Sequence, residues 1–372
     1  MRFKTIMLTV VILITPGLYA RAQETAVLAD CNMVETYHGD VRIQVLPELE
    51  LFQILCQLSG KYQGLNTLDF QYKADIKAGF DAYKDHPAVS VLRRFTDCHP
   101  AHNCIKAYIL NDEYESDPDN LSLLQLENDG AKLQAVAELR AACRQFTKNT
   151  RFVAFFEKHR PYYEGKVQVV KTALTGQDLI TSREAFWGIG KDQYRIVLAL
   201  LERDIHSCWF TNKAQQHSLF VLTPKFAING DAVFGNAETS NPQQGKICAR
   251  DYIYYGSGHE FGHSFLNPIT IKFERQIKEI NFEFTKSGQP TKVDFFNESI
   301  LRTYTAYEFL REGKEDIANM VIQAEQMNGY IYNSKILELI QYYESKRNLY
   351  QRFEDYLPYL LEKLRDIINN NN

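Results

Sequence analysis

The segment HEFGH, residues 259–263, constrains the fold of this chain more than any other stretch of its sequence. Residues four apart lie on one face of an α-helix, so a helix here directs His259 and His263 toward a single cation. Glu260 projects about 100° further round the helix, where its carboxylate can reach a metal-bound water without being a ligand. The motif therefore predicts a helix over residues 257–266 that carries a metal site.

The residues that flank the motif favour a buried helix. Phe261 and Phe265 are four apart, and Leu266 extends the apolar stripe away from the two histidines. The dipeptide Asn267-Pro268 is expected to end the helix, because proline disfavours helical geometry in the residue before it.

A catalytic zinc ion needs three protein ligands and one open position. No histidine follows His263 and no cysteine follows Cys248, so the third ligand is expected to be a downstream carboxylate. The extended pattern with a third histidine is absent, since Leu266 and Ile269 occupy the positions that it requires. The available acids are Glu274, Glu279, Glu283, Asp294, Glu298 and Glu308.

Glu298 is the strongest candidate, because it lies in an apolar helical segment that includes Phe295. A carboxylate in such a stretch is costly unless it is paired or bound to metal. Asp294 stands at the expected start of that helix, where an acid has a capping role, and Glu308 lies near a charged run and is expected to be solvated. Arg302, one turn after Glu298, either orients the ligand or forms an ordinary i,i+4 ion pair.

These residues favour a hydrolytic interpretation. Zn²⁺ held by His259, His263 and Glu298 would lower the pKa of a bound water to about 7. Glu260 would accept the proton of that water as the general base. Four downstream tyrosines are candidates for stabilising the oxyanion, although packing is the default role of any one of the chain's 22 tyrosines. They are Tyr304, Tyr307, Tyr330 and Tyr332.

HEFGH followed by Asn297-Glu298 resembles the motifs of the gluzincin metallopeptidases, in which two helices carry the zinc ligands. The segment between the two motifs is longer here than in the thermolysin-like members. HEFGHSFLNP and NESILRTYTA also resemble a family of exported bacterial proteins, a domain of unknown function with the pattern HEFxHxFxNP. This resemblance covers about residues 41–360. It implies a zinc site and a peptidase that acts on a peptide or protein substrate.

The whole chain predicts an α+β, mostly helical fold. The resemblance implies a zincin-like arrangement, with a small β-sheet beside the HExxH helix and a helical C-terminal lobe. We expect a helical N-terminal region over residues 23–165 and the zincin-like catalytic region over 166–372. Two β-branched and aromatic runs on either side of an Asn-Gly pair predict a β hairpin at about 217–235.

Residues 1–22 have the features of a secretory signal peptide. Arg2 and Lys4 precede a short apolar run, and Ala20-Arg21-Ala22 forms a small-x-small cleavage site. The run is too short to span a bilayer, and no later segment is long and apolar enough to do so. We therefore expect an exported protein, periplasmic or extracellular, without an integral membrane segment in the mature chain.

Composition and the remaining motifs narrow the alternatives. The net charge of −4 gives no sign of the basic surface that binds nucleic acid. CHPAHNC, residues 98–104, has two cysteines that favour a disulfide, since they are spaced too widely for the usual structural zinc site. Two other functions use the same HExxH residues: a non-catalytic, zinc-supported binding protein, and a zinc hydrolase of a non-peptide amide. Glu260 favours an enzyme, because a purely structural zinc site does not need that carboxylate.

Overall fold

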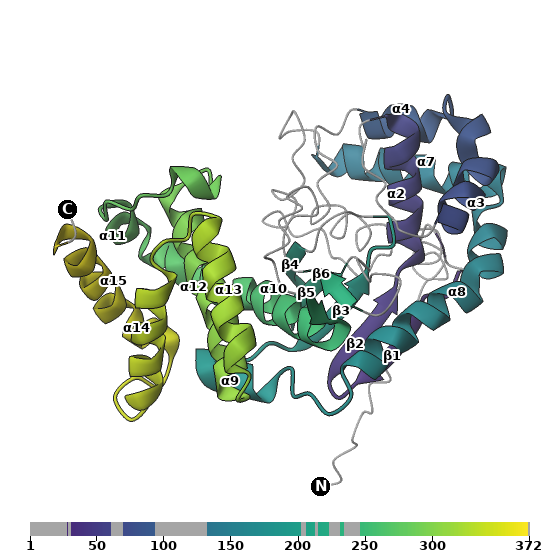
Figure 1. Cartoon of the computed structure of the whole chain (residues 1–372). Helices are drawn as coiled ribbons and strands as arrows, with labels where there is room; N and C mark the ends of the chain where they lie inside the picture. Colours follow the sequence, from purple (N-terminus) through teal and green to yellow (C-terminus); the bar gives the residue numbers. More distant parts are fainter. Residues whose placement is uncertain are drawn as a thin grey trace, which may run out of the picture.

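The fold is α+β and mostly helical, which confirms the predicted class (Figure 1). The computed structural model describes residues 28, 31–60, 70–93, 132–201, 206–212, 215–222, 231–233 and 246–370. The predicted signal peptide, residues 1–22, and the CHPAHNC segment, residues 98–104, lie outside these ranges. No helix within them is long and apolar enough to cross a membrane.

A five-stranded mixed sheet in the order β1-β2-β3-β5-β4 lies at the centre of the fold. Its strands are β1 (Val34–His38), β2 (Val41–Val45), β3 (Gln193–Leu198), β4 (His206–Asn212) and β5 (Gln215–Leu222). The three inner strands β2, β3 and β5 run parallel, and β1 and β4 pair with them in the antiparallel direction. β4 is therefore an edge strand of the described sheet.

The hairpin predicted at about 217–235 is wrong in its strand pairing. β5 pairs with β3 and β4, whereas β6 (Asp231–Val233) pairs with β7 (Lys246–Cys248) in a separate two-stranded sheet. The continuous apolar run of β5, residues 219–222, is fully buried, and such a run is typical of an inner strand with a neighbour on each side. Parallel pairing with β3 therefore outweighs the local turn signal, and the hairpin forms one strand earlier, between β4 and β5.

Among the described residues before residue 175, five segments form α-helices: α2 (Pro47–Ser59), α3 (Phe70–Phe80), α4 (Pro87–Arg93), α7 (Lys132–Thr150) and α8 (Phe152–Ala173). α2 has a proline in its first turn and ends at Gly60 with φ of 72°, which are common start and stop signals. α8 lies against β1 and β2. The predicted boundary at residue 165 falls within α8, and the N-terminal region contributes two strands to the sheet.

The remaining α-helices extend from the sheet to the C-terminal lobe (Figure 1). They are α9 (Thr181–Trp187), α10 (Ala249–Lys272), α11 (Glu274–Lys278), α12 (Lys292–Arg311), α13 (Glu315–Met327), α14 (Asn333–Ser345) and α15 (Phe353–Asn370). α10 contacts β4 and β5 on one side and α12 on the other, so it joins the sheet to the lobe.

α10 is longer than the helix predicted over residues 257–266, and Pro268 lies inside it rather than after its end. A proline in a helix interior costs about 3 kcal/mol. Here Leu266 and Ile269, which lie on either side of the proline, are both buried. Tertiary packing therefore outweighs the local signal that the sequence gives for a helix end.

Two glycines bring α10 close to α12. A Cβ atom added at Gly258 would overlap the Glu308 carboxylate, and one added at Gly262 would lie 2.5 Å from Leu301 Cδ2. Gly258 and Gly262 are one turn apart, so the face of α10 that meets α12 lacks side chains at both positions. This close approach sets the spacing of the two helices.

A buried ion pair lies at the same contact. Arg183 of α9 donates from Nε to Glu308 Oε1 at 2.8 Å, and the Tyr304 hydroxyl donates to the same oxygen at 3.0 Å. Glu308 is fully buried, so the expectation that it is solvated is wrong. The charged run follows the end of α12, but Glu308 lies on the inner face of that helix, where Arg183 offsets its charge.

We predict that Gly258→Ala lowers the free energy of unfolding by about 1–3 kcal/mol, because the new methyl group must displace the Glu308 carboxylate from Arg183. The matched control is Gly165→Ala in α8, where nothing lies within 4 Å of the added Cβ. That change should leave stability equal or raise it by up to about 1 kcal/mol. Urea unfolding followed by circular dichroism measures both, and equal stabilities of the two variants would contradict the close packing.

Candidate metal centre

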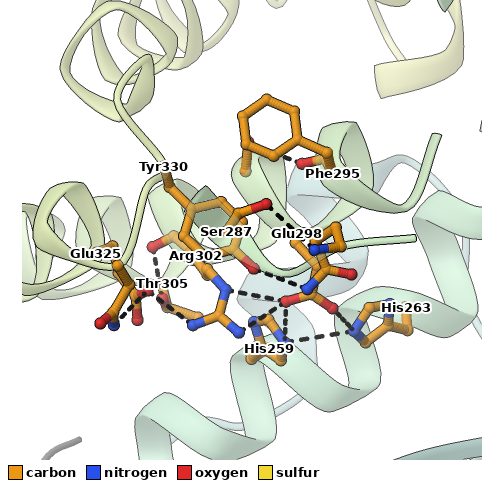
Figure 2. A network of polar contacts seen from close by, with 12 residues as sticks. His259, His263, Ser287, Phe295, Glu298, Arg302, Thr305, Glu325 and Tyr330 are labelled. Carbon is orange, nitrogen blue, oxygen red and sulfur yellow. Dashed lines mark hydrogen bonds and ion pairs between the residues drawn. The ribbon is translucent and has the colours of Figure 1, made fainter. Parts of the chain in front are cut away.

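The three side chains predicted to bind metal converge on one point between α10 and α12 (Figure 2). The Nε2 atoms of His259 and His263 lie 3.3 Å apart. Glu298 places Oε2 at 3.4 Å from His259 Nε2 and Oε1 at 3.3 Å from His263 Nε2. Helical spacing supplies the imidazole pair, and the close contact of the two helices supplies the carboxylate.

These separations fit a zinc ion. Zinc bonds to nitrogen and oxygen of about 2.0–2.1 Å in tetrahedral geometry require ligand atoms about 3.3–3.4 Å apart. The two imidazole Nε2 atoms lie 3.3 Å apart, and each lies 3.3–3.4 Å from a different oxygen of Glu298, so the carboxylate faces the imidazole pair with both oxygens. Two imidazole nitrogens and one carboxylate are also a donor set that leaves a fourth position open in catalytic zinc sites.

Glu260 lies beside this set without replacing Glu298. Ligand atoms of His259, Glu260 and His263 all lie within 4.8 Å of one another, and all three residues are buried. Burial raises the pKa of the Glu260 carboxyl, and the nearby histidines His259 and His263 oppose that effect. The carboxylate of Glu298 is closer to both imidazoles, so Glu260 remains available for proton transfer.

Asn267 fixes the orientation of one imidazole. Its Oδ1 lies 3.2 Å from His263 Nδ1, so a proton on Nδ1 leaves the Nε2 lone pair directed toward the site. The ring of Tyr255 lies nearly parallel to the ring of His259 at a centroid distance of 6.3 Å. Asn267 was considered only as a helix terminator, although its position four residues after His263 places both on one helix face.

Arg302 both pairs with Glu298 and ties it to a third helix. Its Nε and Nη2 each lie 2.9 Å from Glu298 Oε2, and its Nη1 donates to Glu325 Oε2 of α13 at 2.7 Å. Burial alone would raise the pKa of Glu298, but Arg302 and His259 hold it well below its usual range. The two roles considered for Arg302, orienting contact and i,i+4 ion pair, are therefore compatible.

The cluster carries more negative than positive charge. When all are ionised, the cluster holds the three carboxylates of Glu260, Glu298 and Glu325 and the one guanidinium of Arg302, which pairs with Glu298 and Glu325. Buried charges are costly unless they are offset. With neutral imidazoles the excess is two negative charges, which one divalent cation would offset.

The other acids that the sequence offers lie elsewhere. Asp294 is in the first turn of α12, where its backbone N–H donates to Thr291 Oγ1 at 3.1 Å, so it belongs to the helix start as expected. Glu274 pairs with Lys278 on the exposed side of α11. Glu279 and Glu283 are exposed as well.

Of the four candidate tyrosines, Tyr330 is the one that contacts this cluster. Arg302 lies over its ring, 4.6 Å from the centroid, while its hydroxyl accepts a hydrogen bond from Gln289. The other three hydroxyls bond elsewhere: Tyr304 to Glu308, Tyr307 to Glu344 and Tyr332 to the Glu283 backbone. The sequence reasoning missed Glu325, because its contact with Arg302 joins two helices, and it missed Tyr255, although its position one turn before His259 places the two on one helix face.

Comparison with known proteins gives one match. Residues 43–363 match a family described as a domain of unknown function, DUF4932. No curated protein and no solved structure matches the chain.

We predict that Asn267→Leu weakens Zn²⁺ affinity about 10–100-fold, because the His263 ring loses the partner that orients it. Competition with a chromophoric chelator measures the dissociation constant. The matched control is Asn149→Leu, which removes an amide 3.1 Å from the nitrogen of a different histidine, His86. Equal affinities of the Asn267 variant and the control would contradict the orienting role.

Proposed function

We propose that this chain, which belongs to the DUF4932 family, is an exported zinc-dependent metallopeptidase of the gluzincin type. The observation that carries the proposal is the convergence of His259, His263 and Glu298 at the spacing of zinc ligands, with Glu260 buried beside them. The signal-like sequence of residues 1–22 supports export.

Each residue of the cluster has a role in this proposal. His259, His263 and Glu298 would hold the zinc ion. Bound zinc supplies a water of lowered pKa and polarises the scissile carbonyl. Glu260 accepts a proton from water and returns it to the leaving amine.

The sheet offers a place for an extended substrate. β4 is one of the two edge strands of the described sheet and contacts α10, the helix that carries both histidines. A peptide that adds to a sheet edge is held by main-chain hydrogen bonds, whatever its side chains. This arrangement favours a peptide or protein substrate over a small non-peptide amide.

Glu260 also argues against a non-catalytic binding protein. A carboxylate that is only 6% exposed is costly to bury, and zinc binding by His259, His263 and Glu298 does not need it. A role in catalysis accounts for its position.

We predict that Glu260→Gln retains stoichiometric zinc and loses peptide hydrolysis by about 10²–10⁴-fold, because the proton acceptor is removed while the ligands stay. His263→Ala should lose both zinc and activity. Metal analysis of the purified protein and a peptide-library assay measure the two effects.

The matched control is Glu279→Gln, an exposed acid of α11's end that should change neither zinc content nor activity. Wild-type protein without stoichiometric transition metal would end the proposal. Hydrolysis of non-peptide amides alone would favour the amide hydrolase, and zinc binding without turnover of any substrate would favour the binding protein.

A further inference from the structure

We infer that Glu325 of α13 is a positioning residue for the metal centre, acting through Arg302 on the Glu298 carboxylate. The inference rests on the proposed zinc site and extends it to a helix that carries none of the ligands. It comes from the contacts of Arg302 with Glu325 and Glu298 (Figure 2) and from the hydrogen bond that Tyr255 donates to Glu325.

The guanidinium of Arg302 lies between two carboxylates. Two of its nitrogens reach Glu298 Oε2 at 2.9 Å, and the third donates to Glu325 Oε2 at 2.7 Å. One face of the guanidinium stacks on Tyr330. Because the guanidinium is planar and rigid, contacts on both sides and one face fix its orientation. The direction in which Arg302 holds Glu298 therefore depends on Glu325.

Glu325 also reaches the helix that carries the histidines. It is 2% exposed, and its second oxygen accepts a hydrogen bond from the Tyr255 hydroxyl at 3.1 Å. Tyr255 lies one turn before His259 in α10, and the two rings are nearly parallel. Glu325 thus connects α10 with α12, the two helices that must stay in register for the ligands to meet.

The charge of Glu325 is as important as its contacts. Arg302 alone would offset the charge of Glu298 and weaken the attraction of that carboxylate for a cation. Glu325 offsets Arg302 instead, so the three ionised groups together keep one negative charge beside the metal position. Without the Glu325 charge, Arg302 would pair with Glu298 alone, so the loss should lower affinity for a divalent cation through Arg302, even where the fold is unchanged.

A double-mutant cycle on Zn²⁺ affinity tests this role. The four proteins are wild type, Glu325→Gln, Arg302→Met and the double variant, each measured by competition with a chromophoric chelator. Glu325→Gln should weaken Zn²⁺ binding about 10–100-fold in the wild-type background. In the Arg302→Met background the same substitution should change affinity by less than about threefold, because residues that act through one another are coupled.

Two controls separate positioning from general stability. Glu344→Gln changes a partly buried acid of α14 that bonds to Tyr307 and does not touch Arg302, so it should leave Zn²⁺ affinity unchanged. Thermal unfolding of each metal-free variant reports folding. If Arg302→Met does not fold, Arg302→Lys replaces it in the cycle. Lysine keeps the charge but lacks the planar guanidinium that contacts both carboxylates. In the Arg302→Lys background, Glu325→Gln should therefore lower Zn²⁺ affinity less than it does in wild type.

The outcomes distinguish this inference from the proposed function. Wild type that binds no Zn²⁺ removes the metal site itself, and the inference with it. If wild type binds Zn²⁺ and the Glu325→Gln variant binds it with the same affinity, the positioning role alone is overturned. The positioning role is also overturned if Glu325→Gln lowers Zn²⁺ affinity equally in the presence and absence of Arg302, because Glu325 would then act independently of Arg302.

Discussion

The contact between α10 and α12 is the constraint on which the rest of the site depends. Gly258 and Gly262 remove side chains from the face of α10 that meets α12, and the helices approach closely as a result. That approach allows Glu298 of α12 to reach His259 and His263 of α10. A larger side chain at either glycine would have to displace the Glu308 carboxylate or the Leu301 side chain, which now occupy that space.

The same contact contains two buried groups of charges that differ in balance. Arg183 and Glu308 form a complete pair of one cation and one anion, and Tyr304 supplies a further hydrogen bond. Around Glu298, by contrast, the one guanidinium of Arg302 pairs with two carboxylates, those of Glu298 and Glu325. In the balanced pair each buried charge is offset by its partner, whereas an excess of negative charge beside two imidazoles favours a bound cation. The difference in balance therefore distinguishes a structural group from a candidate site.

Local patterns in the sequence were enough to predict the parts of the site that local geometry fixes. The imidazole pair follows from helical spacing alone, and Glu298 stood out because a carboxylate in an apolar segment needs a partner. The interpretation of Glu308 was wrong because its partner, Arg183, is 125 residues away in the chain. The helix end predicted at Pro268 and the hairpin predicted for β5 were wrong for a similar reason. In both cases burial against segments distant in the chain outweighs the local signal for a helix end or a turn. Glu325 has no local signal at all.

The division of the candidate ligands between two helices has a mechanical consequence. An ion held by His263 and Glu298 ties together the two ends of the intervening segment, residues 264–297, much as a disulfide would. Closing such a loop removes conformational freedom from the unfolded chain. The ion would thus act as a removable cross-link. Where zinc is scarce, the chain would lack this cross-link and would be more accessible to proteases.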